Sequence, residues 1–348
     1  MTIHITQPTG KFSWKAMDDI TKVITQDFHG NQVGLYHYNT PETAAQLNPR
    51  MDGIVASIKQ GDTFVFQYMQ WLNQPLFNLA LVQKVKAYGA HTVLFLHDIQ
   101  EYLFGPDLVP LYIATVNFFN EFDVIIAHTE AMKARMIREG ITSEIIVLEL
   151  FDYLSKAPYQ KPIFERKLTL TSGTLEKSPF LYQWQNSTPL DLFILDTFKS
   201  QAEDLSKNNP IIAYKGSLEA DEIPYRLNSG FGLVWMSNQE LVVQESSVTG
   251  IQAEYYSTIN ATYKLSTYLA SGIPVVVKSN IAQAELIKRN NWGLVVDDLD
   301  QIDQAINDVD QAQYDAMASS VEKISKLLTT GFFTRRIIEK AIEKLFLK

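Results

Sequence analysis

The sequence of 348 residues contains no cysteine. This absence excludes disulfide bonds, thiolate metal sites and cysteine nucleophiles. Also missing is any window that approaches the run of about 18 uncharged apolar residues typical of a membrane span. The amino-terminal stretch MTIHITQPTGKF lacks the basic region followed by an apolar region that marks a signal peptide. We therefore expect a cytoplasmic protein without a membrane span.

A surplus of positive charge is absent as well. The chain has 30 Lys and Arg against 39 Asp and Glu, which gives a formal net charge of -9. Nucleic-acid binders normally carry a basic surplus, so this class is disfavoured and no nucleic-acid partner is expected. Small anionic ligands are still compatible with this charge, because a few well-placed Lys and Arg side chains can hold a phosphate.

Two nucleotide-binding fingerprints are missing too. The loop after the first apolar stretch reads TQPTGKFSW, which is not GxGxxG, and no GxxxxGK[ST] loop occurs, so NAD is disfavoured. The triplets DLD (298–300) and DVD (308–310) imitate the D-x-D pattern of metal-dependent nucleotide-sugar enzymes. Both lie near predicted carboxy-terminal helices, where acidic residues commonly cap helices or face solvent. We therefore expect neither a metal nor a cofactor.

What the first half of the chain does contain is an alternation of apolar runs with segments of helical spacing. The predicted strands are 3–6, 32–38, 62–68, 91–98, 123–129 and 144–150. Apolar runs of this kind, each followed by a helix, indicate parallel strands covered on both faces. The pattern predicts an α/β, doubly wound, Rossmann-like domain.

The alternation lapses at residues 151–166, FDYLSKAPYQKPIFER, which predicts a domain boundary. It then resumes, with predicted strands at 167–173, 191–196, 210–216, 230–236, 273–279 and 293–298. We expect two Rossmann-like domains, 1–155 and 156–330, with ligands bound in a cleft at the carboxyl ends of their strands.

Two further segments complete the predicted organisation. Residues 239–257 are polar and without clear periodicity, which predicts a long mobile loop beside the cleft. Residues 331–348 have Phe332, Ile337, Ile338, Ala341 and Leu345 at helical intervals. This spacing predicts an amphipathic helix that packs back toward the first domain.

The most informative stretch, INATYKLSTYLASGIPVVVKSN, begins at residue 259. Asn260 is a good N-cap if Ala261 or Thr262 begins a helix. The first backbone N–H groups of such a helix, together with its dipole, favour a phosphate, and Thr262 and Lys264 would add a hydroxyl donor and a positive charge. An ordinary capped helix with a solvated lysine fits the spacing equally well.

Other candidate ligand contacts are single residues near predicted strand ends. Tyr214 and Lys215 close the strand PIIAYKG, where a tyrosine can stack on a nucleobase. Lys177 follows the turn after the first strand of the second domain and can pair with a diphosphate. Taken alone, each of these residues is also typical of an ordinary protein surface.

The first domain offers fewer candidates. Gly10 permits tight backbone geometry near a ligand. His97 and Asp98 end the strand HTVLFLHD, and His97 is a candidate to act on an acceptor hydroxyl or to stabilise developing charge. A histidine–aspartate pair at a strand end also commonly has a purely structural role. Glu254 and Asp152 are weaker acid/base candidates.

The order and spacing of several motifs resemble those of a bacterial glycosyltransferase family. These motifs are FVFQ, VLFLHD, GFGLVWM, YKLSTYLASGIPVVV and GFFTRR, and they span nearly the whole chain. The sequence resembles glucosyltransferase 3-type enzymes, which extend sugar chains on serine-rich repeat adhesins and are similar to other GT-B sugar transferases, including galactofuranosyltransferases. The resemblance implies a GT-B fold, a homo-oligomer that is a tetramer, and a UDP-sugar donor held mainly by the second domain.

The resemblance also implies an activity and a set of site residues. The activity is the metal-independent, retaining transfer of glucose to a GlcNAc already O-linked to the adhesin, in the cytoplasm. Donor-site positions of the family map onto these residues: Gly10, Lys11, Lys177, Tyr214, Lys215, Asn260, Ala261, Thr262, Tyr263, Lys264 and Leu265.

Several alternatives remain open. They are a transferase of GlcNAc or galactofuranose with the same fold, a non-catalytic nucleotide-sugar-binding partner of a glycosylation enzyme, and a UDP-sugar epimerase. The segment 238–259 is longer than the resemblance leads us to expect, and it adjoins the predicted donor site, so the donor or acceptor can differ from that of the family.

Overall fold

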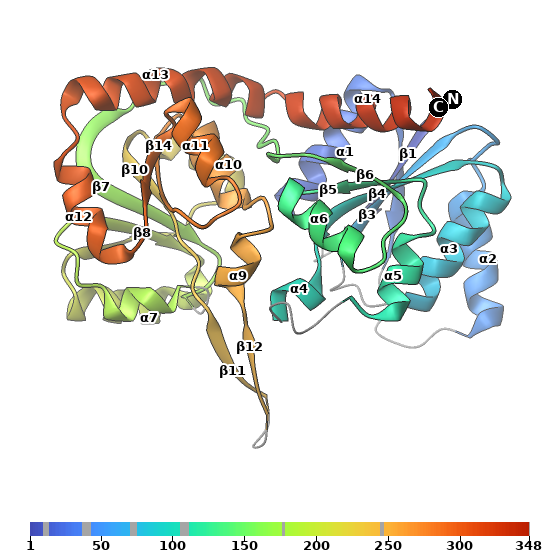
Figure 1. Ribbon diagram of the computed structural model, residues 1–348, viewed down its shortest axis with the longest axis horizontal. Helices are drawn as coiled ribbons and strands as arrows, with labels where there is room; N and C mark the ends of the chain where they lie inside the picture. Colours follow the sequence, from blue (N-terminus) through green and yellow to red (C-terminus); the bar gives the residue numbers. More distant parts are fainter. Residues whose placement is uncertain are drawn as a thin grey trace. The chain divides into compact units, whose positions relative to one another are not determined.

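A computed structural model of the chain describes residues 1–9, 14–36, 43–69, 75–104, 111–175, 178–243 and 247–347. The chain forms two compact units (Figure 1). Unit 1 comprises Met1–Tyr102, Asp107–Glu149 and Gly331–Lys348, and unit 2 comprises Leu103–Pro106 and Leu150–Thr330. The boundaries proposed from the sequence follow residues 155 and 330, whereas the chain, apart from the short segment Leu103–Pro106, passes between the units after Glu149 and Thr330.

Unit 1 contains a six-stranded parallel sheet with the strand order β2-β1-β3-β4-β5-β6. The strands are β1 (Ile3–Pro8), β2 (Asn31–Leu35), β3 (Thr63–Met69), β4 (His91–Asp98), β5 (Val124–Ala127) and β6 (Glu144–Val147). The helices are α1 (Lys15–Asp27), α2 (Ala44–Val55), α3 (Pro75–Ala87), α4 (Gln100–Phe104), α5 (Ile113–Phe119), α6 (Glu130–Arg138) and α14 (Phe332–Phe346). Six consecutive residues of β4, Thr92 to His97, are buried, as expected for a parallel strand covered on both faces.

The last helix, α14, belongs to unit 1 although it is the last element of the chain. It buries Phe333, Ile337, Ile338, Ala341 and Leu345 and packs on α1, β5 and β6. Arg335 adds an ion pair with Asp27 of α1, with 2.7 Å between Nη1 and Oδ2.

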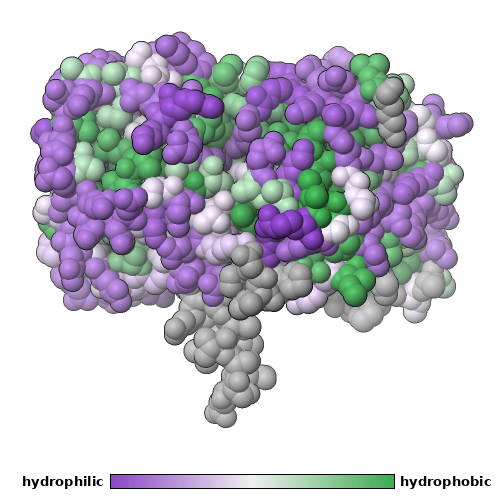
Figure 2. Space-filling model, viewed as in Figure 1, coloured by the Kyte–Doolittle hydropathy of each residue, from purple (hydrophilic) through white to green (hydrophobic). Residues whose placement is uncertain are grey.

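Unit 2 contains a second six-stranded parallel sheet with the order β14-β13-β10-β7-β8-β9. The strands are β7 (Ile163–Ser172), β8 (Leu190–Ile194), β9 (Ile212–Gly216), β10 (Ser229–Val234), β13 (Val275–Lys278) and β14 (Gly293–Val296). The helices are η3 (Pro179–Gln183), η4 (Asp196–Phe198), α7 (Lys199–Asn208), η5 (Ala220–Glu222), α8 (Ile223–Arg226), α9 (Ala253–Ser257), α10 (Tyr263–Ala270), α11 (Ala284–Asn290), η6 (Leu299–Gln301), α12 (Ile302–Asn307) and α13 (Gln311–Leu328). The face seen in Figure 2 is mostly hydrophilic, in keeping with a chain in which 20% of the residues are charged.

Two expectations for unit 2 are wrong. Residues 239–257 are not a long loop: they contain an antiparallel hairpin, β11 (Gln239–Val243) and β12 (Ser247–Ile251), followed by α9 (Figure 1). Each strand has only five residues, too few to show a clear period among the polar residues around them. The first strand also starts earlier than expected, because Ile163 pairs with Ser229 of β10 before a shift in register.

Candidate functional site

Helix α10 begins at Tyr263, and Thr262 is its N-cap residue. Asn260 is therefore not the N-cap residue. Its backbone N–H donates to Tyr256 O (2.9 Å), so Asn260 belongs to the turn that ends α9. Thr262 has an extended backbone, and its side chain makes no capping hydrogen bond. The first turn of α10 thus lacks the side-chain partner that usually satisfies one of its N–H donors.

Helix α10 is held firmly against the sheet of unit 2. Tyr268 is fully buried, and its hydroxyl accepts a hydrogen bond from Thr171 N of β7 (2.9 Å). A Cβ atom on Gly232 of β10 would lie 2.2 Å from the Tyr268 ring, so only glycine permits this close packing. At the other end, Ser325 Oγ donates to Ala270 O (2.9 Å). The start of α10 is therefore a rigid feature of the fold.

Two buried polar atoms near this helix start lack a hydrogen-bond partner within the described part of the chain. They are Asn260 Oδ1 and Ser266 Oγ. Buried polar groups are nearly always satisfied, so an unsatisfied group calls for an explanation such as a bound ligand. Asn260 Oδ1 is an acceptor and would take a hydrogen bond from a hydroxyl or N–H group of a ligand, whereas the positive end of the α10 dipole favours an anion.

The remaining residues of 260–265 divide into two roles. Ala261, Thr262 and Leu265 are buried. The Tyr263 ring packs 5.3 Å from that of Tyr153, with its centroid 6.1 Å from Phe151. These residues hold the turn in place, and Lys264, the second residue of α10, is partly buried.

Tyr214 and Lys215 lie on β9, at the far side of the same sheet. Tyr214 N donates to Ser206 Oγ of α7 (3.0 Å). Burial, followed by the nearby carboxyl groups of Asp196 and Glu203, raises the pKa of Tyr214. Because β9 is separated from β10 by β7 and β8, Tyr214 is about 14 Å across the sheet from β10, the strand on which α10 packs.

Lys215 has a different environment from Tyr214. Its Nζ forms an ion pair with Asp191 Oδ1 of β8 (3.4 Å), and Lys167 of β7 pairs with the other oxygen of the same carboxylate (3.2 Å). Lys215 is thus part of a charge cluster along the strands, and the structure does not bring it together with the start of α10. Three other predicted donor-site residues, Gly10, Lys11 and Lys177, lie outside the described residues.

An ion pair that the sequence analysis did not anticipate fastens α9 to the sheet. Glu254 of α9 contacts Lys278 at the end of β13. The Lys278 ammonium also lies 5.6 Å from the Trp235 ring centroid, just after β10. Trp235 and Lys278 both lie near the ends of predicted strands, 230–236 and 273–279. This position is the one feature of the sequence that could have indicated that the two side chains lie close together. The pairing gives Glu254 a structural contact between α9 and β13.

In unit 1, His97 lies in a buried polar network at the carboxyl end of β4. Its Nε2 is 3.0 Å from Gln67 Oε1, and Gln67 Nε2 donates to Thr6 O (2.8 Å) and Thr21 Oγ1 (3.0 Å). The Gln67 amide is oriented by those donations, so its oxygen accepts and His97 Nε2 carries the hydrogen.

The burial of His97 decides what chemistry it can perform. Burial, followed by the nearby His128, lowers the pKa of His97 to about 3. The imidazole is therefore neutral at pH 7, and a base this weak takes up a proton poorly. The geometry favours hydrogen bonding over proton abstraction.

Asp98 is the last residue of β4, and Asp152 is buried in unit 2.

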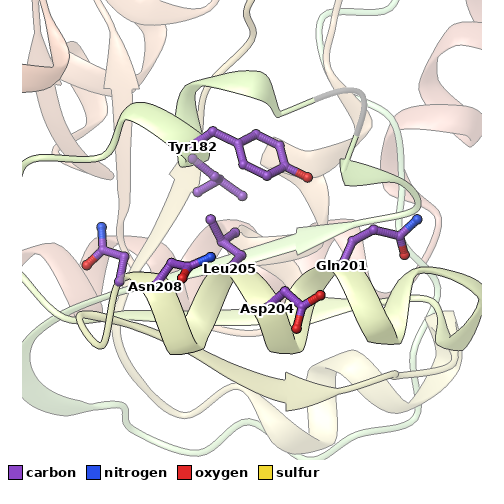
Figure 3. A pocket seen from close by; sticks show the side chains of 7 residues that line it. Tyr182, Gln201, Asp204, Leu205 and Asn208 are labelled. Carbon is purple, nitrogen blue, oxygen red and sulfur yellow. The ribbon is translucent and has the colours of Figure 1, made fainter.

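A separate groove of about 430 Å³ lies between η3 and α7 on unit 2 (Figure 3). Its lining residues are Leu181, Tyr182, Gln201, Asp204, Leu205, Asn208 and Asn209. None of these is a predicted site residue. Within the described residues, no group of three His, Asp or Glu side chains is placed to hold a metal ion, and no helix is long and apolar enough to cross a membrane.

Comparison with known proteins identifies the family. The model "Glucosyltransferase 3-like, N-terminal domain" matches residues 2–150, and "Glucosyltransferase 3-like, C-terminal domain" matches residues 169–341. The chain is 31% identical to "Glucosyltransferase 3" of Streptococcus gordonii over 332 residues, covering 94% of this chain and 93% of that protein.

Two solved structures show the fold. The sucrose-phosphate synthase of Thermosynechococcus elongatus aligns with a TM-score of 0.64 at 10% identity, over 99% of each chain. The structure "Trehalose-6-phosphate from E. coli bound with UDP-2-fluoro glucose" aligns with a TM-score of 0.62 at 9% identity, over 98% of each chain. These likenesses confirm the predicted α/β architecture of two Rossmann-like domains and its GT-B arrangement. The chain therefore belongs to the glucosyltransferase 3-like family of glycosyltransferases.

Proposed function

We propose that this glycosyltransferase moves a hexose, with glucose favoured, from a UDP-sugar to a sugar already O-linked to a serine-rich repeat adhesin. The observation that carries the donor assignment is the start of α10, where the N-cap residue Thr262 makes no side-chain capping hydrogen bond and the positive end of the helix dipole favours an anion. The names of the relatives support it: one is a glucosyltransferase, and one structural neighbour is bound with UDP-2-fluoro glucose.

The proposed donor site spans the carboxyl edge of the unit 2 sheet. Tyr214 on β9 contacts the uridine, and the diphosphate lies at the start of α10, next to Asn260 and Lys264. The distance of about 14 Å between β9 and β10 is comparable to the length of an extended nucleoside diphosphate. Lys177, Gly10 and Lys11 are part of the same proposal as donor-site residues.

The chemistry follows from charge development. As the bond between sugar and phosphate breaks, negative charge builds on the diphosphate. The N–H groups at the start of α10 and the Lys264 ammonium stabilise that charge more in the transition state than in the ground state. In this proposal the transfer retains configuration and needs no metal, and His97 orients the reacting sugar as a neutral hydrogen-bonding group. The working form is a cytoplasmic homotetramer.

Two measurements test the proposal. Calorimetric titration of UDP, ADP and GDP is expected to show a clear preference for UDP, and equal or absent binding of all three contradicts the donor assignment. Incubation with UDP-glucose and a GlcNAc-modified peptide is expected to add one hexose mass to the peptide. UDP binding without any mass increase would instead favour a non-catalytic binding partner.

A further inference from the structure

Glu101 is a buried acidic residue with no role in the donor site. It lies in α4, which follows β4 directly, and its side chain is 3% exposed. Its Oε1 accepts a hydrogen bond from Thr115 Oγ1 of α5 (2.5 Å). Its Oε2 has no hydrogen-bond partner within the described part of unit 1. A buried oxygen without a hydrogen bond raises the free energy of the folded protein. A ligand that donates a hydrogen bond to this oxygen would therefore bind more tightly.

The position of Glu101 is fixed by its neighbour in the chain. The Tyr102 hydroxyl donates to Oε2 of Glu139, the C-cap residue of α6 (2.8 Å). The guanidinium of Arg135 stacks 3.9 Å from the centre of the Tyr102 ring, and Arg135 Nε donates to Glu139 Oε1 (2.8 Å). This buried cluster clamps α4 onto α6. Glu101 is therefore presented by a rigid element, which is the arrangement that precise recognition requires.

The surroundings of Glu101 suit a ligand with several hydroxyl groups. Tyr68 of β3 is 6% exposed, and burial, followed by the proximity of Glu101, raises its pKa, so its phenol stays protonated. The Tyr68 ring is packed against Phe119, with centroids 5.0 Å apart. A carboxyl oxygen that accepts, two hydroxyls that donate or accept, and an aromatic wall together match the chemistry of a sugar.

The position of Tyr68 and Glu101 in unit 1 is also consistent with the binding of a sugar. Tyr68 pairs with Leu96, one residue before His97, so the ends of β3 and β4 bring Tyr68, His97 and Glu101 to the same carboxyl edge of unit 1. Ligands of open α/β sheets bind at this edge. Unit 2 holds the proposed donor site, so the carboxyl edge of unit 1 is available for the second substrate.

We propose that Glu101 is a specificity-determining residue that accepts a hydrogen bond from a hydroxyl group of the acceptor sugar, with Thr115 orienting the carboxyl group. The inference rests on the proposed function and extends it, because it assigns an acceptor contact to a residue of unit 1. Glu101 binds the acceptor and plays no part in holding UDP.

The test separates acceptor binding from donor binding. Full-length wild type and Glu101→Gln are compared for UDP affinity by calorimetry and for transfer from UDP-glucose to a GlcNAc-modified peptide. Loss of a strong hydrogen bond is expected to raise the KM for the peptide about tenfold or more, with the UDP Kd unchanged. Thr115→Val is expected to raise the same KM by less. Glu339→Gln, which replaces an exposed glutamate of α14, is the matched control and leaves both constants unchanged.

A second arm guards against a general folding defect in the variant. Peptides carrying singly deoxygenated GlcNAc are compared in wild type and Glu101→Gln. One deoxygenated position is expected to raise KM in wild type but not in the variant, because the contact is already lost. The inference is overturned if Glu101→Gln has the same KM for the peptide as wild type. It is also overturned if every deoxygenated peptide raises KM equally in both proteins. Either result leaves the proposed function standing. A wild type that binds no UDP overturns both.

Discussion

At the scale of single residues, Lys264 carries the clearest prediction for the donor site. It is the second residue of α10, and in the proposed donor site its ammonium group is expected to act on the diphosphate and not on the uridine. Lys264→Ala is expected to weaken UDP binding about tenfold or more, because charge-assisted hydrogen bonds are among the stronger ones, and to leave uridine binding nearly unchanged. Calorimetry with both ligands measures the difference. Lys288→Ala, on the exposed side of α11, is the control, and an equal loss for UDP and uridine would place Lys264 elsewhere.

At the scale of elements, the packing of α10 on β10 depends on Gly232. A methyl group there would meet the buried Tyr268 ring, which is also tied to Thr171. Gly232→Ala is expected to reduce the free energy of unfolding of unit 2 by about 1–3 kcal/mol through overpacking, and to weaken UDP binding by displacing the helix start. Urea denaturation and calorimetry measure the two effects. Gly173→Ala serves as the control because a Cβ atom at Gly173 meets nothing within 4 Å; similar stability of both variants would refute the packing argument.

A second element-scale prediction concerns the link between α12 and the segment before β8. Asp303 accepts hydrogen bonds from Ser187 N (2.7 Å) and Thr188 N (2.8 Å), and from both hydroxyl groups. Burial by itself raises the pKa of Asp303, but the bonds from Thr188 and Ser187 outweigh it, so the pKa lies below 3.8. A depressed carboxyl pKa contributes stability above the unfolded-state pKa, and this stability is lost as pH falls through the folded-state pKa.

Asp303→Asn is therefore expected to lower the free energy of unfolding by about 1 kcal/mol at pH 7. The difference from wild type is expected to shrink as the pH falls below about 4, because wild-type Asp303 then becomes protonated. Denaturation curves between pH 7 and pH 3 measure this trend. Asp300→Asn, at an exposed position nearby, is the control, and a gap between Asp303→Asn and wild type that does not depend on pH would contradict the role of the charge.

At the scale of the whole molecule, two units with separate sheets predict unfolding in two steps. The proposed donor residues of the described part all lie in unit 2. UDP at about 100 times its Kd is expected to stabilise unit 2 by about 2.7 kcal/mol and to raise its Tm by roughly 5–10 °C. The Tm of unit 1 is expected to rise less, because only Gly10 and Lys11 of the proposed donor residues belong to that unit. Differential scanning calorimetry with and without UDP measures both transitions. Equal shifts of the two transitions would show that UDP is not held mainly by unit 2 or that the units unfold together.

The sequence predicts the buried strands of this protein better than it predicts the short hairpin and the start of α10. Buried parallel strands such as β4 are recognisable because continuous apolar runs are needed on both faces of the sheet. The hairpin formed by β11 and β12 was missed because its strands are short and lie in a polar setting. The N-cap of α10 was placed two residues early, because the bond from Asn260 N to Tyr256 O extends the preceding turn and no local preference announces it.

The sequence by itself determined the double α/β alternation and the family, and it indicated the stretch 259–280 as the leading candidate site, since these depend on periodicity and on order along the chain. Tertiary structure alone decided that Gln67 fixes the hydrogen position of His97, that Glu254 is paired with Lys278, and that Glu101 keeps one unsatisfied oxygen. Hydrogen-bond partners such as Gln67 and Thr6 are 61 residues apart, and burial depends on every element that covers a side chain. Contacts across such separations are set by how the strands and helices pack, and a reading along the chain does not contain that information.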